Sequence, residues 1–233
     1  MQIQFTIFTK NDTDSKSLNE FLREIVNGRL KFNKFDYKEP VKQTINNPEE
    51  IVTMLTDYGN IILTGKNKSN ITAWLGDEYP TALQGHFNLK DKGFGIDDVI
   101  SLIEILAKDD YLLFAGIYSE DEFDLKHKIV KQYSYTWKGI SPADFMEHIP
   151  GIYWYTIFGK ELVQVIGKEK FKNLPNVTYT APKDGCIAFH LNEPIESDDL
   201  VSRLSKENEL ANIIGKNYFF DKNEVSVTDY CKG

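Results

Sequence analysis

Hydrophobic and polar residues alternate at the start of the chain and then recur at helical spacing. Residues 2–8 alternate between apolar and polar side chains, which predicts a half-buried strand. Over residues 18–26 the apolar side chains fall three and four positions apart, which predicts a helix. Asp14 or Ser15 would cap this helix and Gly28 would end it. The chain therefore opens with a strand and an amphipathic helix.

The same patterns continue to the end of the chain and give both halves one element order. The first half continues with an extended insertion at 29–46, a helix at 48–58, strands at 60–64, 70–75 and 83–89, a helix at 96–107 and a strand at 111–118. The second half has a strand at 151–158, a helix at 162–167, strands at 177–180 and 186–191, a helix from Ser197 to Ile214 and a strand at 218–220. Both halves read strand–helix–strand–strand–helix–strand, with an extra hairpin inserted in the first, which is the split βαβ order.

These elements predict an α+β protein whose two ferredoxin-like (split βαβ) halves pack into one body. We expect antiparallel sheets with the helices on one face. The first half would span residues 1–118, a helical connector 119–150 and the second half 151–233, and no Gly/Ser- or Pro-rich linker separates them. The connector would carry helices near 121–132 and 142–148. The halves share no identifiable sequence repeat, so their origin by duplication is a hypothesis.

Composition narrows the class of protein without identifying it. Of the 233 residues, 41% are hydrophobic and 27% are charged, as in ordinary globular proteins. Two cysteines are too few for a disulfide scaffold or a four-cysteine zinc site. No apolar run approaches the roughly 18–20 residues that cross a bilayer, and the first residues do not resemble a secretion signal. We therefore expect a cytoplasmic protein.

Negative charge is concentrated in one quarter of the chain. The formal net charge is −8, and residues 69–124 hold twelve acids against three lysines. If these acids fold onto one face, their field would attract a cationic partner and disfavour nucleic acid. The alternative is a set of solvated loops and helix ends, with Asp97 and Asp98 in the first turn of a helix.

Aromatic residues accompany the acids at three places. Trp and Tyr are the usual anchors of protein interfaces, so these segments are candidates for binding a partner. The expected partner-binding residues are Trp74, Asp77, Glu78, Tyr79, Asp109, Asp110, Tyr118, Glu120, Asp121 and Glu122. For Trp74 the alternative is a place in the hydrophobic core.

The sequence contains no recognisable catalytic or metal-binding motif. Asp124 and His127 lie three apart on a predicted helix and could bind a metal with Glu120, although a solvated helix gives the same pattern. Cys186 and His190 share one face of a predicted strand, but their Cα atoms would be about 13 Å apart. We expect Cys186 to be a core residue. The sequence therefore predicts no catalytic residue, no metal and no cofactor.

One segment resembles a known family. Residues 149–167 read Ile-Pro-Gly-Ile-Tyr-Trp-Tyr-Thr-Ile-Phe-Gly and continue to Gly167. This resembles the Pro-Gly-hydrophobic-aromatic-Trp and Phe-Gly segment of the immunity protein 52-like group of polymorphic and type VI toxin systems. The similarity continues more loosely at 174–175, 185–189 and up to 214–215, and it covers roughly residues 141–221, with a weaker match at 110–119.

The resemblance implies a protein that binds and neutralises a cognate toxin without catalysing a reaction. Since many immunity proteins block basic nucleases, the implied toxin is cationic. Two other functions remain open. One is a small-molecule-binding or enzymatic protein with a cleft between the halves, near His127 or His148 and the aromatic residues Tyr133, Tyr135 and Trp137. The other is a scaffold or adaptor subunit. The sequence leaves the oligomeric state open.

Overall fold

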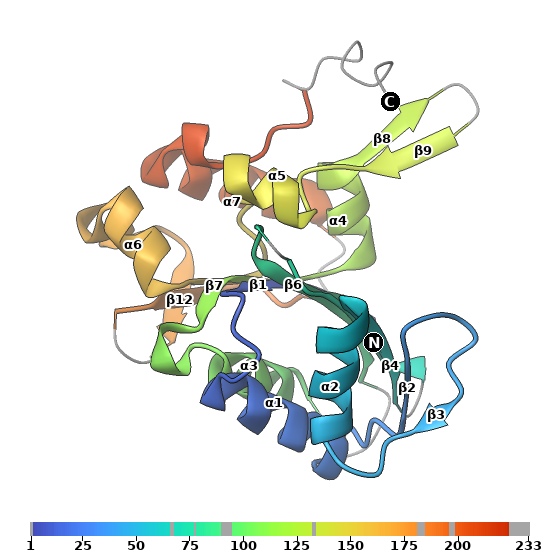
Figure 1. Cartoon of the computed structure of the whole chain (residues 1–233). Helices are drawn as coiled ribbons and strands as arrows, with labels where there is room; N and C mark the ends of the chain where they lie inside the picture. Colours follow the sequence, from blue (N-terminus) through green and yellow to red (C-terminus); the bar gives the residue numbers. More distant parts are fainter. Residues whose placement is uncertain are drawn as a thin grey trace.

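The computed structural model describes residues 2–65, 68–76, 78–89, 95–131, 134–180, 185–195 and 199–223 (Figure 1). Its first elements are β1 (Gln2–Thr9), α1 (Lys16–Asn27), β2 (Lys34–Asp36), β3 (Gln43–Thr44), α2 (Glu49–Tyr58), β4 (Asn60–Thr64), β5 (Asn70–Trp74), β6 (Thr81–Asn88), α3 (Ile96–Ile105), the 3-10 turn η2 (Lys108–Asp110) and β7 (Leu112–Tyr118). They are followed by α4 (Glu120–His127), β8 (Lys128–Lys131), β9 (Ser134–Trp137), α5 (Pro142–Glu147), β10 (Tyr155–Phe158), α6 (Lys160–Ile166), η3 (Lys168–Phe171), β11 (Val177–Thr180), β12 (Ile187–Leu191), α7 (Leu200–Ile214) and η4 (Lys216–Tyr218). The predicted α+β class is confirmed.

One ten-stranded antiparallel sheet runs through the whole molecule, in the order β11-β12-β10-β7-β1-β6-β5-β4-β2-β3. Strand β1 pairs with β6 on one side and with β7 on the other. Strands β1 and β5 are parallel with β6 between them, and β6 and β7 are parallel with β1 between them. This is the split βαβ order that the sequence predicts for the first half. The segment from β2 to β4 is inserted between α1 and β5.

The second half lacks the fourth strand that the sequence predicts at 218–220. The chain there forms η4, and Phe219 makes only an isolated parallel bridge with Ile149. The place beside β10 belongs instead to β7, which pairs with β10 in antiparallel orientation. Strand β7 thus serves both halves and joins them into one sheet. The boundaries that the sequence suggests for the halves remain an interpretation.

Each half keeps its helices on one face, but the two halves use opposite faces of the shared sheet. Helices α1, α2 and α3 lie below the sheet in Figure 1, whereas α4 to α7 lie above it. The reason is topological. Strands β1 and β10 run parallel to each other, because both are antiparallel to β7, which lies between them. The connection from β1 to β5 moves along the sheet away from β7 on one side, and the connection from β10 to β11 moves away from β7 on the other side. Because such crossovers are right-handed, their helices fall on opposite faces.

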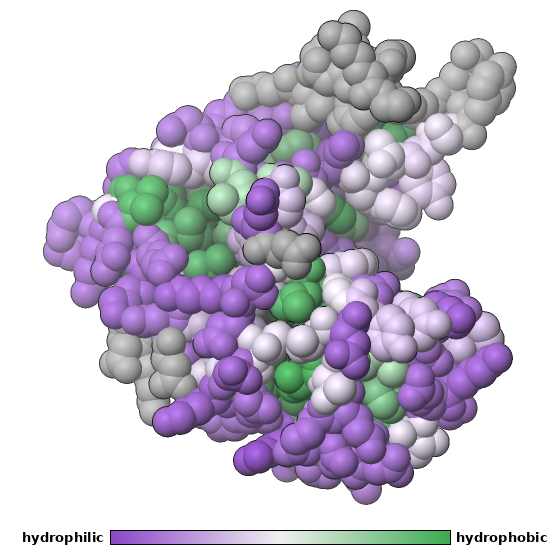
Figure 2. Space-filling view, viewed as in Figure 1, coloured by the Kyte–Doolittle hydropathy of each residue, from purple (hydrophilic) through white to green (hydrophobic). Residues whose placement is uncertain are grey.

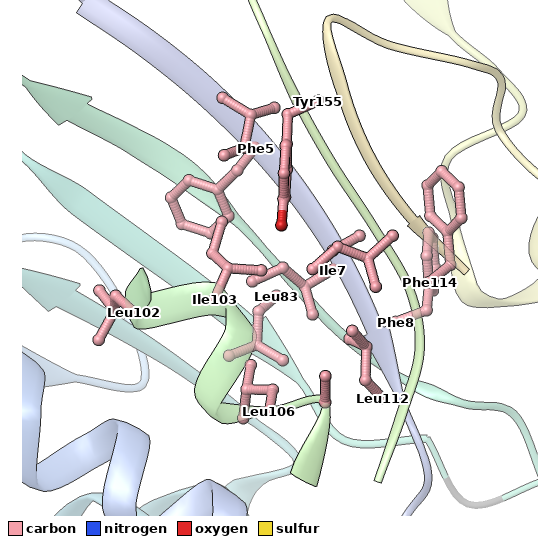
Figure 3. Close-up of a cluster of buried hydrophobic side chains, with 14 of the residues drawn as sticks. Phe5, Ile7, Phe8, Leu83, Leu102, Ile103, Leu106, Leu112, Phe114 and Tyr155 are labelled. Atoms are coloured by element: carbon pink, nitrogen blue, oxygen red, sulfur yellow. The ribbon is translucent and has the colours of Figure 1, made fainter. Parts of the chain in front are cut away.

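Two hydrophobic layers result from this arrangement. On the lower face Phe5 and Ile7 pack with side chains of α3, as Figure 3 shows for Leu102 and Ile103. On the upper face the ring of Phe8 stacks on Phe145 of α5, with the ring centroids 4.2 Å apart. Neighbouring residues of β1 therefore enter different cores, which explains why almost all of this strand is buried despite its alternating sequence.

Several local predictions shift by a few residues. Ser15, one of the two expected caps, caps α1 by accepting from the backbone N–H of Leu18. The connector helix expected at 121–132 ends at His127, and β-branched residues continue the chain as the hairpin β8–β9. Strand β10 begins at Tyr155 rather than at residue 151. The expected α7 cap, Ser197, lies outside the described residues, and Asp199 accepts from the N–H of Ser202 there. None of the described helices has the length and apolarity needed to cross a membrane.

Candidate interaction site

The acidic segments do not come together on one face. Asp110 lies just before β7 and pairs with Lys160 at 2.7 Å, whereas Glu120 and Asp121 begin α4 beyond the other end of β7. The seven residues of β7 hold these ends about 20 Å apart. Glu78 and Tyr79 are exposed in the turn between β5 and β6, at the Asp110 end of the sheet. Asp77 and the side chain of Asp109 lie outside the described part of the chain.

Two of the expected partner-binding residues lie in the interior. The side chain of Tyr118 is buried, its hydroxyl is 2.5 Å from Thr6 Oγ1, and its ring stacks on Phe123. Burial raises the pKa of Tyr118. Glu122 is fully buried as well. Neither side chain belongs to the surface that the sequence assigns to it, because the neighbouring acids and aromatic residues do not show which side of β7 or of α4 faces inward.

Glu122 belongs to a buried cluster of charges between α4 and α7. Lys126 Nζ lies 3.2 Å from a Glu122 oxygen and 2.6 Å from a Glu207 oxygen. Arg203 lies 3.5 Å from Glu122 and donates at 2.8 Å to the carbonyl of Ile195. Burial raises the pKa of Glu207 well above its usual range, and the charge of Glu122 adds to this shift. The contacts of Lys126 and Arg203 with these acids join α4 to α7.

His127 has a structural place beside this cluster. Its Nε2 lies 2.7 Å from the hydroxyl of Tyr153 and its Nδ1 lies 2.7 Å from the carbonyl of Lys138. Burial lowers the pKa of His127 to about 3. Both ring nitrogens are engaged, and among the described residues no three His, Cys, Asp or Glu side chains gather as metal ligands. Gly116 of β7 makes room for Tyr153, since a Cβ at Gly116 would lie 2.2 Å from that ring.

The Cys186–His190 pair is separated in the structure. Cys186 precedes β12, is half-buried, and has its Sγ 3.8 Å from the carbonyl oxygen of Ala107. The His190 ring stacks on Trp154, with the centroids 5.5 Å apart. The two side chains thus have different neighbours, and Cys186 lies at the edge of the core rather than within it.

A groove with two tryptophans opens between the sheet and the connector. It has a volume of about 500 Å³ and is lined by Trp74, Gln84, Thr136, Trp137, Ile140, Ser141 and Pro142, which we call the aromatic groove. The side chains of Trp74 and Trp137 are 37% and 41% exposed. Figure 2 shows the outline of the molecule notched on the right, between the part that carries β8 and β9 and the part that carries α2 and β3. Among the expected partner-binding residues that the structure describes, only Trp74 lines this groove.

The ring of Trp137 is held in place from the side of α4. Its Nε1 donates to Asp124 at 3.0 Å, and the other oxygen of Asp124 is 2.5 Å from Lys128 Nζ. Lys128 also lies 4.6 Å from the ring centroid of Tyr135, whose ring meets Trp137 edge-on at 4.9 Å. Burial would raise the pKa of Asp124, but the hydrogen bonds from Lys128 and Trp137 outweigh it and lower that pKa.

A hydrogen bond closes the groove on the side of the sheet. Gln84 Nε2 of β6 donates at 2.9 Å to the carbonyl of Ile140, just before α5. The capping box of Ser141 and Asp144 then fixes the start of α5. The groove is therefore built from fixed groups rather than from a loose loop. Sequence reasoning named Trp137 and Tyr135 only for a small-molecule cleft, since nothing in the sequence places β9 beside β5 and β6.

Comparisons with known proteins give a fold and no family. No family model matches the sequence, and no curated protein matches it. A solved structure, the Pseudomonas aeruginosa T6SS protein PA0821, is similar with a TM-score of 0.57 and 12% sequence identity. The similarity covers 94% of this chain and 73% of that chain. At this identity the likeness shows the fold alone.

Proposed function

We propose that this chain is an immunity protein, which binds a cognate toxin of a type VI secretion system and neutralises it by contact alone. The observation that carries the proposal is the aromatic groove with its two exposed tryptophans, of which Trp137 is held by a hydrogen bond. Large aromatic side chains anchor most tight protein interfaces, and exposed apolar patches mark places where another molecule binds. The fold of a T6SS protein and the resemblance of residues 149–167 to the immunity protein 52-like group support the same function.

The groove suits tight binding because hydrogen bonds hold two of its side chains, Trp137 and Gln84, in the free protein. Asp124 accepts a hydrogen bond from the indole of Trp137, and Gln84 ties strand β6 to the carbonyl of Ile140. A partner that fills the groove would therefore lose little side-chain freedom on this side of the interface. The toxin would be neutralised because the bound immunity protein covers the toxin's active site or its substrate-binding surface.

Co-expression with the product of the adjacent reading frame tests the proposal. If that product inhibits bacterial growth, this chain should restore growth, and the two purified proteins should elute together at a fixed stoichiometry. Replacing both Trp74 and Trp137 by Ala should abolish protection. Val165→Ala, at an exposed apolar position of α6, is the matched control and should protect fully. Failure of the unaltered chain both to protect and to co-elute would reject the function.

A second candidate is a small-molecule site in the same groove. Its volume lies within the roughly 300–1,000 Å³ of ligand pockets, and Gln84 supplies a polar group among apolar ones. It also lies where the first half meets the connector, close to the cleft that the sequence suggests. A metabolite that raises the melting temperature of the chain, but not that of Trp137→Ala, would favour this candidate over toxin binding.

A further inference from the structure

On one face, part of the large sheet is covered by none of the helices that the structure describes (Figure 1). Residues of β1, β4, β5 and β6 that point to the upper face are mostly half-buried or exposed, although the lower face of the same strands is buried. We call the uncovered positions the open sheet face: Gln2, Gln4, Asn60, Ile62, Thr64, Asn70, Thr72, Trp74, Gln84, His86 and Asn88. Trp74 and Gln84 belong to both this face and the aromatic groove, so the two surfaces are continuous.

The helices end where the open sheet face begins. Phe123 of α4 stacks on Tyr118 of β7, and Phe145 of α5 stacks on Phe8 of β1. Beyond these contacts the sheet continues through β6, β5 and β4, and no described helix lies over the upper side of these strands. The edge of the helical layer is the wall of the groove, formed by Ile140 and Pro142. A partner lying on the open sheet face would therefore abut this wall.

Within β1, β4, β5 and β6 the open sheet face carries no Asp, Glu, Lys or Arg side chain, and it ends at β2, where the exposed Lys34 pairs with Thr64. Charged residues make up 27% of the chain, and a solvated surface normally contains at least that share. Here the side chains are amides, hydroxyls, one imidazole and one indole. Antibody paratopes use a similar mixture, in which aromatic anchors supply contact area and neutral polar groups supply hydrogen bonds. Solubility alone does not account for a neutral sheet face on a chain of net charge −8.

We propose that the open sheet face and the aromatic groove form one docking surface, and that the partner protein meets it with an uncharged surface. This inference rests on the proposed function and names the surface and the partner's chemistry. A charged partner side chain would lose its water against the neutral amides without gaining an ion pair, so it would weaken the complex. The acids at the two ends of β7 would remain outside the contact. The complex should then depend only weakly on salt, because few charges approach one another.

A single charge placed in the centre of the docking surface tests the proposal. Thr72 lies on β5 between Ile62 of β4 and Gln84 of β6, with a half-buried side chain. Thr72→Arg should weaken binding to the product of the adjacent reading frame roughly 100-fold or more, as unpaired charges do in an interface. Thr178→Arg on β11, at an exposed strand position away from the surface, is the matched control. Its dissociation constant should stay within about threefold of the original value.

A pair of isosteric substitutions, Asn70→Asp and Asn192→Asp, separates a loss of binding from a loss of folding. Asn70→Asp adds a charge on the open sheet face without changing the shape of the side chain and should weaken binding roughly tenfold. The same change at the exposed Asn192 should leave binding unchanged. Circular dichroism and melting temperature should be the same for all four variants and the unaltered chain. The dissociation constant of the unaltered chain should change less than about threefold between about 0.05 and 0.5 M salt.

The outcomes separate this inference from the proposed function. Absence of any complex with the unaltered chain would reject the proposed function. A complex that forms, resists Thr72→Arg and Asn70→Asp, and weakens with salt or with Glu120→Lys would overturn the docking surface in favour of the acidic ends. Tryptophan fluorescence should not respond to a neutral oligosaccharide such as chitotetraose. A response that Thr72→Arg removes would overturn the inference, because the neutral face would then be a glycan site.

Discussion

Helix α4 carries two clusters of rings and charges, one on each side, and they differ chiefly in burial. On the inner side Glu122 and Lys126 meet Arg203 and Glu207 beside the ring of Tyr153, and all but Lys126 are buried. On the outer side Asp124 and Lys128 meet Tyr135 and Trp137, whose rings stay exposed. The residue types are alike, yet the inner cluster fixes the fold and the outer one presents aromatic surface.

The comparison teaches that an acid beside an aromatic residue does not by itself mark an interface. Glu122 and Tyr118 have the composition expected of a binding surface, but both are buried. Trp137 comes from a segment without an acidic run, but it is exposed and held in place. Substitutions at four residues test this contrast between the two sides of α4.

The largest effect is expected at Arg203. Arg203→Met keeps the length of the side chain but leaves Glu122 and Glu207 buried with one fewer positive charge. Removing one partner of a buried charge cluster typically costs about 3–5 kcal/mol of unfolding free energy. Urea denaturation would measure this loss. Arg23→Met, at an exposed ion pair with Glu49, is the control and should cost less than about 1 kcal/mol. Equal stabilities of the two variants would contradict a structural role for the inner cluster.

His127 should make stability fall as the pH is lowered. Burial lowers the pKa of His127 to about 3, with Lys126 assisting and the Lys138 carbonyl and Asp144 opposing. As the pH falls, His127 binds a proton near pH 6.5 in the unfolded chain but only near pH 3 in the folded chain. The stability that the neutral imidazole contributes is therefore complete above about pH 6.5 and is lost gradually between about pH 6.5 and pH 3.

Comparison with a non-titrating variant isolates this contribution. Between pH 7 and pH 4.5 the unaltered chain should lose about 2–3 kcal/mol that His127→Gln does not lose. His148→Gln, at an exposed histidine, should follow the unaltered chain. Parallel pH profiles for His127→Gln and the unaltered chain would show that His127 is not held neutral in the folded state.

Trp137 should affect binding and leave folding nearly intact. Trp137→Ala removes an anchor from the aromatic groove and should weaken the complex by about 2 kcal/mol, a roughly 30-fold change in the dissociation constant. Calorimetric titration would measure it, with Val165→Ala as the control for an exposed apolar side chain. The melting temperature of Trp137→Ala should stay close to that of the unaltered chain. A large drop would mean that the outer cluster is structural, like the inner one.

The smallest effect is expected from removing the charge of Asp124 alone. In Asp124→Asn an amide oxygen can still accept from Trp137 Nε1, while the ion pair with Lys128 is lost. Since exposed ion pairs contribute little, the dissociation constant should change less than about threefold. Asp124→Ala releases the indole and should weaken binding roughly tenfold. If both variants behaved alike, the charge rather than the hydrogen bond would position the ring.

The sequence predicted the local elements better than their assembly. Apolar spacing located α1, α3 and β4, because those segments bury one face and the period records it. It could not show that β7 serves both halves, because sheet pairing depends on contacts between residues far apart in the chain. For the same reason the strand expected at 218–220 was wrong, since β7 already occupies its place.

The candidate site was only partly predictable. Trp74 was singled out from its neighbours in the sequence, but the groove also needs Gln84 and Trp137, which come from other elements. The neutral character of the open sheet face depends on the register of β4, β5 and β6, because it appears only when alternate residues of several strands are read together.

The central position of β1 also has a consequence for how the chain reaches its fold during synthesis. Gln2 pairs with Asn88 of β6, and Gln4 pairs with Tyr118 of β7. Strand β1 is synthesised first, so it stays unpaired until β6 and β7 have left the ribosome. Such pairings give the topology a high contact order, which slows folding. Until β6 and β7 arrive, the nascent chain carries an apolar strand with two unpaired edges. A chaperone that shields the early chain should therefore raise the yield of folded protein more than one that acts after release.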